Sequence, residues 1–362
     1  MGSESLVGMS IAHGLPLIGH GSANGSDHSA SSPKGGALID SFGRIHNNLR
    51  ISVTDRCNLR CTYCMPEEVT FLNRRELLTF EEITHFVRVA APLGIDKIRL
   101  TGGEPLMRRE MHKLVAMLVE IPGIRDIGLT TNGLLLADQA KPLYDAGLRR
   151  LNVSLDTLDP GRFRELSRRD GVEEVLSGLA AAKAAGFHPI KVNAVAIRGF
   201  IEHDAAPLAR YCRDNGFEMR FIEYMPIGAD HWERSKVFFA AELLELLERE
   251  VAPLIPATDY DPRAPAMDFV YADSGGRIGL IASVSRPFCR SCNRVRLTAE
   301  GKLRNCLFAL DETDVKPLLR DRPDDEALAQ LIRHNVAVKW EGHEINTARF
   351  VKPPRTMHAI GG

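Results

Sequence analysis

The chain has 362 residues, of which 44% are hydrophobic and 26% charged, and its formal net charge is −1. This length is typical of one large barrel-like domain with an extension, or of two domains, with enough apolar surface for a substantial core. Proteins that bind long polyanions usually carry a strong basic surplus, so nucleic acid is not an expected partner. The sequence contains no run of about 18 or more apolar residues, which argues against a membrane partner.

The N-terminal segment, residues 1–42, is rich in Gly, Ser and His and contains only a weak apolar patch at Ile11 to Ile18. It lacks the basic start and the long apolar run of a secretory signal. It also holds too little apolar surface to offset the entropy that ordering would cost. We therefore predict a disordered leader over residues 1–42 and a cytoplasmic protein.

Apolar strand patterns followed by helical patterns recur along the chain. The predicted strands are Arg50–Thr54, Lys97–Thr101, Asp126–Thr131, Arg149–Leu155, Lys191–Ile197 and Glu218–Glu223. Helices are predicted between them at Phe80–Leu93, Arg109–Val119, Leu136–Ala146, Val172–Ala185 and Ala205–Asn215. Strands that alternate with helices favour a parallel sheet covered by helices. Because six such units fall short of eight, we predict an α/β fold for residues 43–263, an incomplete (βα)6 TIM-type barrel.

This rhythm stops after about residue 263. Beyond it we predict strands at Phe269–Ala272, Arg277–Val284 and Arg294–Leu297, and helices at Val315–Leu319 and Asp325–His334. We interpret residues 264–362 as a C-terminal extension that covers the open side of the barrel. Ligands of such barrels contact the C-terminal ends of the strands. Chemically interesting residues lie at or just after the ends of the first four strands: Cys57, Gly103, Thr130 and Ser154.

Six of the seven cysteines form two groups, here called the first trio (Cys57, Cys61 and Cys64) and the second trio (Cys289, Cys292 and Cys306). Disulfide frameworks are typical of small secreted chains, which this one does not resemble. Structural zinc takes four ligands, usually as two close pairs, so zinc remains an alternative for the second trio. Three thiolates at CxxxCxxC spacing can instead hold three irons of a cubane and leave the fourth iron open to a small molecule. The isolated Cys212 is predicted to be a small buried hydrophobe.

The segment from Cys57 to Cys64, with Tyr63 before its last cysteine, resembles the signature of the radical S-adenosylmethionine (SAM) superfamily. A second mark of that superfamily, Gly102-Gly103-Glu104-Pro105, follows one predicted helix and one predicted strand later. The resemblance implies a [4Fe–4S] cluster whose open iron binds SAM, so that cleavage of SAM releases a 5′-deoxyadenosyl radical. It also implies that the Gly102-Gly103 turn meets the methionine amino group of SAM.

From about residue 48 onward the chain also resembles a narrower family, the GTP 3′,8-cyclases (MoaA) of molybdenum cofactor biosynthesis. The resemblance is carried by the second trio, by Arg294 and Arg296 beside it, and by the terminal Gly361-Gly362. It implies a second [4Fe–4S] cluster, on the second trio, whose open iron anchors guanine. The adenosyl radical would remove hydrogen from the ribose C3′ of GTP, and the carbon radical would attack guanine C8. The product would be 3′,8-cyclo-7,8-dihydro-GTP.

The same resemblance implies partners and binding residues. The partners are GTP, an external electron donor and the next pathway enzyme, cyclic pyranopterin monophosphate synthase, which uses the product; a homodimer is left open. The residues implied for SAM are Tyr63, Gly103, Ser154 and Met225. Those implied for GTP are Arg50, Arg99, Thr130, Lys191, Arg294, Val295 and Arg296, with Arg220 as a less certain addition. A catalytic role is implied for the first trio, Arg294 and Arg296.

Arginine suits a triphosphate because its planar fork pairs with phosphate oxygens bidentately. Each of these cations can equally be a surface charge or half of an ion pair, Ser154 an ordinary strand-end hydroxyl, and Met225 core packing. Arg99, Lys191 and Arg220, however, lie within strands predicted to be buried, where an unpaired cation is costly and a triphosphate would supply a partner. For the terminal diglycine, the sequence alone favours a frayed tail.

Two rival functions stay open at this point. The nearer one is another radical SAM enzyme with an auxiliary iron–sulfur cluster, such as a peptide maturase. Those enzymes have longer C-terminal segments that are richer in cysteine, whereas the C-terminal segment of this chain has three cysteines. The other rival, from a different class, is a non-catalytic zinc-binding or iron–sulfur scaffold protein.

Overall fold

A single twelve-stranded sheet organises the residues that the computed structural model describes, which are 36–228, 231–259, 261–273 and 275–361. The strand order is β12-β11-β10-β1-β2-β3-β4-β5-β6-β9-β8-β7. Every neighbouring pair from β10 to β9 is parallel, and the pairs beyond them at both edges are antiparallel. The strands are β1 (Asn48–Ser52), β2 (Lys97–Thr101), β3 (Asp126–Thr131), β4 (Arg150–Ser154), β5 (Ile190–Ala196), β6 (Glu218–Glu223), β7 (Leu254–Pro256), β8 (Met267–Tyr271), β9 (Arg277–Ile281), β10 (Arg294–Leu297), β11 (Lys302–Arg304) and β12 (Thr313–Asp314).

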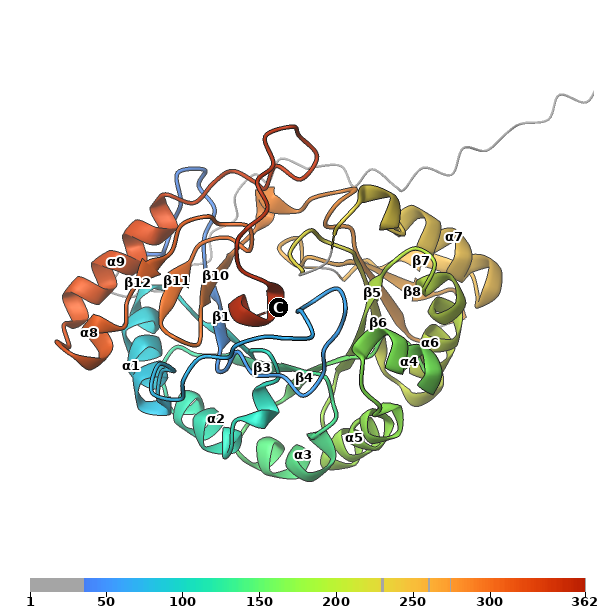
Figure 1. Ribbon diagram of the computed structural model, residues 1–362, viewed down its shortest axis with the longest axis horizontal. Coiled ribbons are helices and arrows are strands. Elements are labelled where there is room, and N and C mark those ends of the chain that lie inside the picture. Colours follow the sequence, from blue (N-terminus) through green and yellow to red (C-terminus); the bar gives the residue numbers. More distant parts are fainter. Residues whose placement is uncertain (1–35, 229–230, 260, 274, 362) are drawn as a thin grey trace, which may run out of the picture. The chain divides into compact units, whose positions relative to one another are not determined.

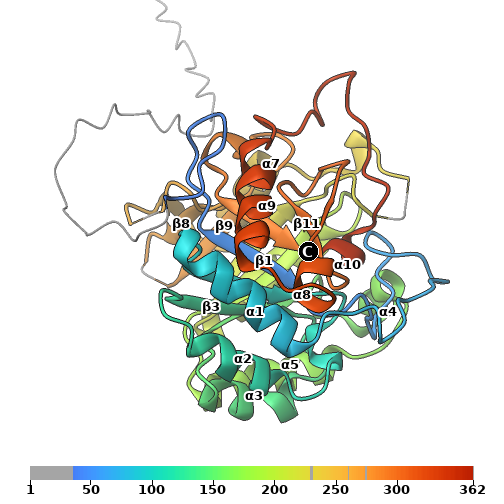
Figure 2. The ribbon, with the colours of Figure 1, turned by 90° about the vertical axis from the view of Figure 1, so that its left-hand side faces the viewer.

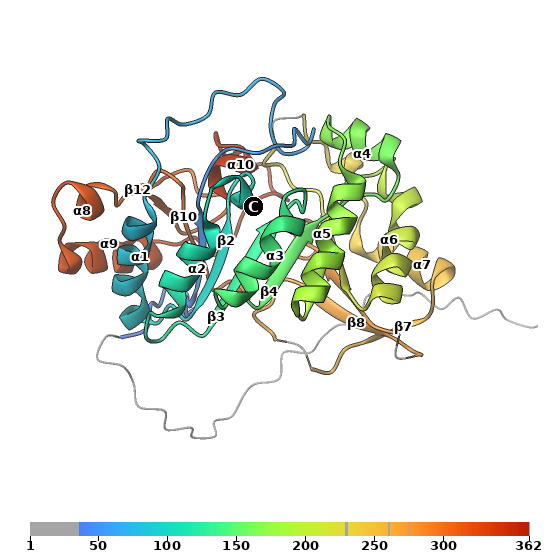
Figure 3. The same ribbon diagram turned by 90° about the horizontal axis from the view of Figure 1, so that it is seen from below.

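Helices cover one face of this sheet (Figures 1 and 3). They are α1 (Phe80–Ala90), α2 (Met111–Val119), α3 (Leu136–Asp145), α4 (Pro160–Ser167), α5 (Val172–Ala185), α6 (Ile201–Asn215), α7 (Ala240–Glu250), α8 (Pro317–Arg320) and α9 (Asp325–Ala337). The short helix α10 (Met357–Ile360) lies apart from them. The protein is therefore α/β with a mostly parallel sheet, as the sequence predicted at that level. None of the described helices is long and apolar enough to cross a membrane.

Local sequence signals explain where several helices begin and end. Thr79 caps α1: its hydroxyl accepts from the Glu82 amide at 3.1 Å, and the Glu82 carboxylate accepts from the Thr79 amide at 2.7 Å. This reciprocal arrangement satisfies amides that have no partner inside the helix. At the other end of a helix, Gly186 follows α5 with φ of +100°, a conformation that costs glycine little.

The two faces of the sheet differ in chemistry. In β1, Leu49 and Ile51 are buried in the core, while Arg50 between them stays partly accessible. Successive side chains of a strand point to opposite faces, and β2 repeats the pattern with Arg99 between two buried apolar residues. The helix-covered face is therefore apolar. The opposite face, here called the inner face, carries polar and charged side chains.

The C-terminal residues extend both edges of the same sheet. Strand β10 lies parallel beside β1, and β9 lies parallel beside β6. Helix α9 lies beside α1 (Figure 2). Helix α8 also contacts α1, and its Arg320 pairs with Glu82 of α1 at 2.6 Å. Figure 1 places α10 and the C-terminal end of the chain inside the arc of strands, away from the outer helices.

Several boundaries differ from the sequence prediction. Strand β1 begins two residues before the predicted start at Arg50, because Asn48 is paired on both sides, with Lys97 and with Arg294. Helices α4 and α7 were not predicted. Within the predicted leader, residues 1–35 lie outside the described residues, whereas Leu38 is buried and donates its amide to Leu93 O at 3.1 Å. The end of the predicted leader is thus part of the packed structure.

Candidate active site

The two cysteine trios flank the inner face from opposite ends of the same strands. Cys57 comes five residues after the C-terminal end of β1 at Ser52, and Cys292 comes two residues before the start of β10. Strands β1 and β10 are neighbours and run parallel, with Asn48 opposite Arg294. Cys57 follows β1 and Cys292 precedes β10, so these cysteines lie beyond opposite ends of the strands. Cys306 follows β11, which runs back antiparallel to β10 toward Cys292. A five-residue strand spans about 16 Å, which sets the scale of the space between the trios.

The Gly102-Gly103 turn after β2 packs against the loop that carries the first trio. Gly103 donates its amide to Thr54 O at 2.8 Å. A Cβ at Gly103 would lie 2.4 Å from Arg56 O, and one at Gly102 would lie 2.6 Å from Thr54 O. Only glycine allows this approach. The turn therefore fixes the backbone immediately before Cys57.

Glu104, the residue after this turn, also helps to hold the loop that carries the first trio. Its buried carboxylate accepts from Thr131 Oγ1 at 2.7 Å and from the Asn132 amide at 2.6 Å. Burial raises the pKa of Glu104 to about 7 despite these hydrogen bonds. Asn132 in turn places its side-chain Nδ2 3.8 Å from the Cys57 sulfur and 2.8 Å from Asn58 Oδ1. Glu104 and Asn132 thus hold the cysteine loop against the ends of β2 and β3.

The three thiols of the first trio lie within electrostatic reach of one another. Burial, then the charges of Cys64, Asp156 and Cys57, raise the pKa of Cys61 well above its usual range. Burial also raises the pKa of Cys57 to about 11. Three partly buried thiols on one short loop can bind separate irons of one cluster, and binding would release their protons.

A small cavity of about 40 Å³ lies beside the first trio, lined in part by Cys61, Tyr63, Ser154 and Asp156. Tyr63 donates its hydroxyl to Asp156 Oδ2 at 2.7 Å, and burial raises the pKa of Asp156 to about 6. Two of the residues predicted for SAM therefore meet at a cysteine of the first trio. Met225 does not line this cavity; it packs against a separate apolar group that includes Phe308 and Ile360.

A row of four arginines crosses the inner face between the trios: Arg294 and Arg296 of β10, Arg50 of β1 and Arg99 of β2. Arg296, Arg50 and Arg99 are register neighbours on adjacent strands. Burial and then Arg296, Arg294 and Arg99 lower the pKa of Arg50 well below its usual range.

These like charges are poorly neutralised by the protein. Among the described residues, no hydrogen bond or ion pair involves Arg50, and the buried Nη1 of Arg99 has no hydrogen-bond partner. Burial and then Arg150 lower the pKa of Arg99 to about 10. Four adjacent cations with so few partners are chemically suited to bind a polyanion.

The four other residues predicted for GTP, which lie outside the arginine row, have different surroundings. Val295 lies between Arg294 and Arg296, so its side chain points to the opposite face, where it is buried in the apolar core. Lys191 of β5 does lie on the inner face, but it is paired with Glu218 of β6, its register neighbour. Thr130 lies on the inner face of β3, opposite Asn152 of β4. Arg220 keeps a buried Nε without a hydrogen-bond partner among the described residues.

The C-terminal tail reaches the arginine row. Arg296 donates through Nη1 to Gly361 O at 2.7 Å. Gly361 is buried against the ends of β1 and β2: a Cβ there would lie 2.7 Å from Thr101 Cγ2 and 3.2 Å from Ser52 Cβ. The frayed tail that sequence alone favoured is wrong for Gly361, whereas Gly362 lies outside the described residues.

The second trio has a more cationic environment than the first. The Cys292 sulfur lies 3.5 Å from Arg294 Nη2 and 3.4 Å from Lys339 Nζ. Burial alone would raise the pKa of Cys292, but the charges of Arg294 and Lys339 outweigh it and lower the pKa to about 6. Cys306 accepts the Phe308 amide at 3.4 Å. One thiol of this trio is therefore prepared as a thiolate before any metal binds.

Within the described part of the chain, no group of three or more His, Cys, Asp or Glu side chains is arranged to hold a single metal ion. Structural zinc requires four ligands around one point. In a cubane, by contrast, each thiolate binds its own iron, so the sulfurs need not converge.

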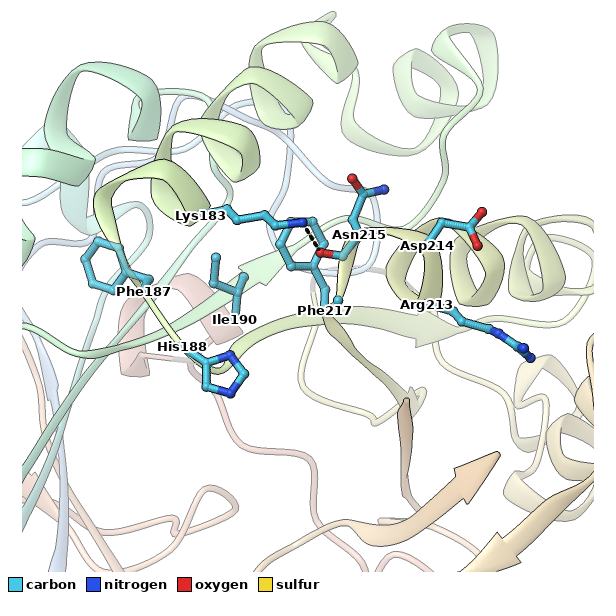
Figure 4. Close-up of a pocket in the computed structure, with 9 residues that line it drawn as sticks. Lys183, Phe187, His188, Ile190, Arg213, Asp214, Asn215 and Phe217 are labelled. Atoms are coloured by element: carbon cyan, nitrogen blue, oxygen red, sulfur yellow. Dashed lines mark hydrogen bonds between the residues drawn. The ribbon is translucent and has the colours of Figure 1, made fainter. Parts of the chain in front are cut away.

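A larger cavity, of about 390 Å³, lies elsewhere (Figure 4). It is lined by Lys183 at the end of α5, by His188 before β5, and by Arg213 and Asn215 at the end of α6. Lys183 donates to Asn215 O at 2.7 Å. This cavity opens at the N-terminal ends of β5 and β6 and contains none of the residues predicted for SAM or GTP, so it is not the active site.

Sequence reasoning missed three residues of the site: Asn132, Asp156 and Lys339. Asn132 follows the end of β3 directly and Asp156 comes two residues after the end of β4, and their position at strand ends was a signal that could have found them. Lys339 gave no such signal, because it follows α9 at a long sequence distance from the cysteine that it contacts.

Known proteins match this chain over most of its length. A GTP 3′,8-cyclase from Rhodopirellula baltica is 48% identical over 331 residues, covering 90% of this chain and 92% of its own. A GTP 3′,8-cyclase from Mycolicibacterium smegmatis is 45% identical over 362 residues, covering 97% and 99%. The chain belongs to the GTP 3′,8-cyclase family. Two family models divide it in agreement with that membership: the Radical SAM superfamily matches residues 51–212, and Molybdenum Cofactor Synthesis C matches residues 217–345.

A solved structure of different sequence shares the fold of this family member. The crystal structure of Streptococcus suis SuiB bound to S-adenosylmethionine superimposes with a TM-score of 0.56 at 17% identity, covering 79% of this chain and 68% of that chain. Membership of the radical SAM superfamily implies one [4Fe–4S] cluster and SAM. The three thiols of the first trio are donors of the kind that such a cluster takes.

Proposed function

We propose that this chain is a GTP 3′,8-cyclase: it converts GTP to 3′,8-cyclo-7,8-dihydro-GTP in the first step of molybdenum cofactor biosynthesis. One observation carries the proposal beyond the family match. A row of poorly neutralised arginines lies between two cysteine trios at opposite ends of the same strands. A nucleoside triphosphate placed along that row would have one reacting end at each trio.

The first trio would hold a [4Fe–4S] cluster, and Tyr63, Gly103 and Ser154 would surround the SAM bound to it. When bound there, the cluster and SAM would supply the radical chemistry that removes hydrogen from the ribose C3′ of GTP. The protein contributes position. Gly103 fixes the loop before Cys57, and the side chain of Asn132 contacts the Cys57 sulfur. Tyr63, held by Asp156, closes the side of the small cavity.

Arg50, Arg99 and Arg294 would bind the triphosphate, since each can donate two parallel hydrogen bonds to phosphate oxygens. Arg296 donates to Gly361 O in the ligand-free protein. It would therefore couple the C-terminal tail to the nucleotide. Thr130 would add a hydroxyl. We leave the Val295 side chain out of this set, because it faces the apolar core.

The second trio would hold a second [4Fe–4S] cluster, with one iron free of protein thiols for the guanine base. Cys292 is prepared for iron by Arg294 and Lys339. Guanine held at this end would fix C8 relative to the ribose, which is the orientation that ring closure needs. The proposal includes an external electron donor and the next pathway enzyme, cyclic pyranopterin monophosphate synthase, as user of the product.

We also interpret the parallel part of the sheet as an incomplete (βα)6 barrel formed by β1 to β6. Its support is the alternation of helix-facing apolar and inner polar residues along these strands. Strands β9 and β10 would flank that barrel at its two open edges.

Deuterium transfer tests the proposed reaction. The protein, reconstituted with iron and sulfide without oxygen, is incubated with SAM, dithionite and GTP carrying deuterium at C3′. We expect deuterium in 5′-deoxyadenosine and a new isomer of GTP, both detected by mass spectrometry. ATP, or GTP deuterated at C8, should give no labelled 5′-deoxyadenosine. SAM cleavage that proceeds without GTP, or without transfer of the label, would favour another radical SAM enzyme with an auxiliary cluster.

A further inference from the structure

Lys339 is a buried lysine whose ammonium group points at the second trio. Lys339 is only 3% exposed. The Nζ atom donates to Arg294 O at 2.7 Å and lies 3.4 Å from the Cys292 sulfur. Within the described ranges it forms no ion pair with any carboxylate. The Cys292 sulfur, which carries negative charge once it binds iron, is thus placed to compensate this buried charge.

A second contact, with the His46 ring, orients the ammonium group of Lys339. His46 Nδ1 lies 3.5 Å from Lys339 Nζ, and His46 Nε2 lies 2.9 Å from Asp40 Oδ2. Hydrogen bonds from His46 and Arg44 outweigh the effect of burial and lower the pKa of Asp40 to about 2, so it is a carboxylate. Burial and the charge of Lys339 lower the pKa of His46 to about 4, so its ring is neutral. Nε2–H then donates to Asp40, which leaves Nδ1 as the acceptor for Lys339.

Arg44 ties the same segment to the second trio through backbone groups. Its Nη1 donates to Cys289 O at 2.8 Å and to Glu341 O at 2.5 Å, and its Nη2 donates to Trp340 O at 2.5 Å. The segment before β1 therefore carries two devices: Arg44 holds the backbone around the trio, and His46 holds the ammonium of Lys339.

We propose that Lys339 is a positioning residue of the second cluster: its ammonium donates to the Cys292 sulfur and favours the reduced state of the cluster bound there, while His46 and Asp40 keep it aimed. The inference rests on the proposed second cluster. Reduction adds one electron to the cluster and breaks none of its bonds to sulfur. A fixed cation beside a ligand sulfur stabilises the more negative of the two redox states, and hydrogen bonds to the sulfurs are a known determinant of cluster potential.

The test isolates the second cluster. The full chain carrying Cys57→Ala, Cys61→Ala and Cys64→Ala is reconstituted without oxygen and titrated with dithionite while its electron paramagnetic resonance signal is recorded. We expect Lys339→Met to lower the ratio of reduced to oxidised cluster at least tenfold at a fixed potential, which is 59 mV for a one-electron couple. Lys302→Met, at a lysine paired with Asp314 in the same region, is the matched control and should leave the ratio unchanged.

Two further variants make the result decisive. Lys339→Arg keeps the charge and should keep most of the wild-type potential, so a shift in it as large as that of Lys339→Met would overturn the role of charge. His46→Gln should shift the potential in the same direction as Lys339→Met, but less. An unchanged potential in Lys339→Met would overturn the inference and leave the proposed function standing. Absence of any cluster from the triple cysteine variant would instead contradict the proposed function.

Discussion

Replacing Arg50 by methionine should stabilise the ligand-free protein and weaken its affinity for GTP. Methionine keeps an apolar stem in place of the arginine stem but removes the charge. In the ligand-free state, Arg50 has Arg99 and Arg296 as register neighbours and no hydrogen-bond or ion-pair partner among the described residues. A residue retained at a cost to stability is the pattern expected of a binding site.

The size of the effect follows from the spacing of the strands. Guanidinium groups on neighbouring strands about 5 Å apart repel by about 3 kcal/mol at an effective dielectric constant of about 20. Solvent at the inner face screens part of this, so we expect the free energy of unfolding to rise by about 1–3 kcal/mol. Each lost hydrogen bond to a phosphate is worth about 1.5–3 kcal/mol. Loss of one such bond would therefore raise the Kd for GTP by roughly 10- to 150-fold, and loss of both would raise it further.

Chemical unfolding of the iron-free protein and calorimetric titration of the reconstituted protein with GTP measure the two quantities. Arg304→Met provides the contrast in stability, because Arg304 is 1% exposed and both of its terminal nitrogens are engaged, Nη1 with Glu312 and Nη2 with Ala309 O. Loss of a paired buried cation should destabilise the protein by about 3–5 kcal/mol. A lower free energy of unfolding in Arg50→Met, or a change in its Kd for GTP of less than about threefold, would refute the assignment of Arg50 to the binding site.

Two further predictions concern the cysteine trios. Gly103→Ala would bring a Cβ to 2.4 Å from Arg56 O, so this variant should have a displaced first trio and about four fewer irons per chain. The control Gly36→Ala, whose Cβ would meet nothing within 4 Å, should keep its irons. Equal iron contents in the two variants would refute this prediction. In the iron-free protein at pH 7, Cys292 (pKa about 6) should be alkylated by iodoacetamide far faster than Cys57 (pKa about 11), as read by peptide mass spectrometry. The rate at Cys292 should fall only as the pH drops through about 6, while the rate at Cys57 should still rise tenfold per pH unit at pH 8; the reverse order would contradict the assigned environments.

Much of the frame could be predicted from the sequence because its signals are local. The predicted bounds of β2, β3, β6, β10 and α5 agree with the structure, since each segment has a clear apolar pattern and a turn signal at its end. The spacing of the cysteines and the family resemblance identified both trios. Confirmation of the family came from relatives that cover 90% or more of the chain.

What the sequence could not provide is register and long-range contact. The pairing of Lys191 with Glu218 depends on which residues of β5 and β6 face each other. The outward direction of Val295 follows from the alternation of β10 once Arg294 is placed on the inner face. The relay from Asp40 through His46 to Lys339 joins segments 293 residues apart, and no local pattern encodes it.

The central claim is that the chain holds two clusters, each with one iron free of protein thiols. A Mössbauer spectrum of protein reconstituted with 57Fe, recorded alone, with SAM and with GTP, tests it most directly. We predict about eight irons per chain, with SAM changing the signal of one iron in one cluster and GTP changing one iron in the other. A spectrum with only four irons, or one in which neither ligand alters any iron, would contradict the account.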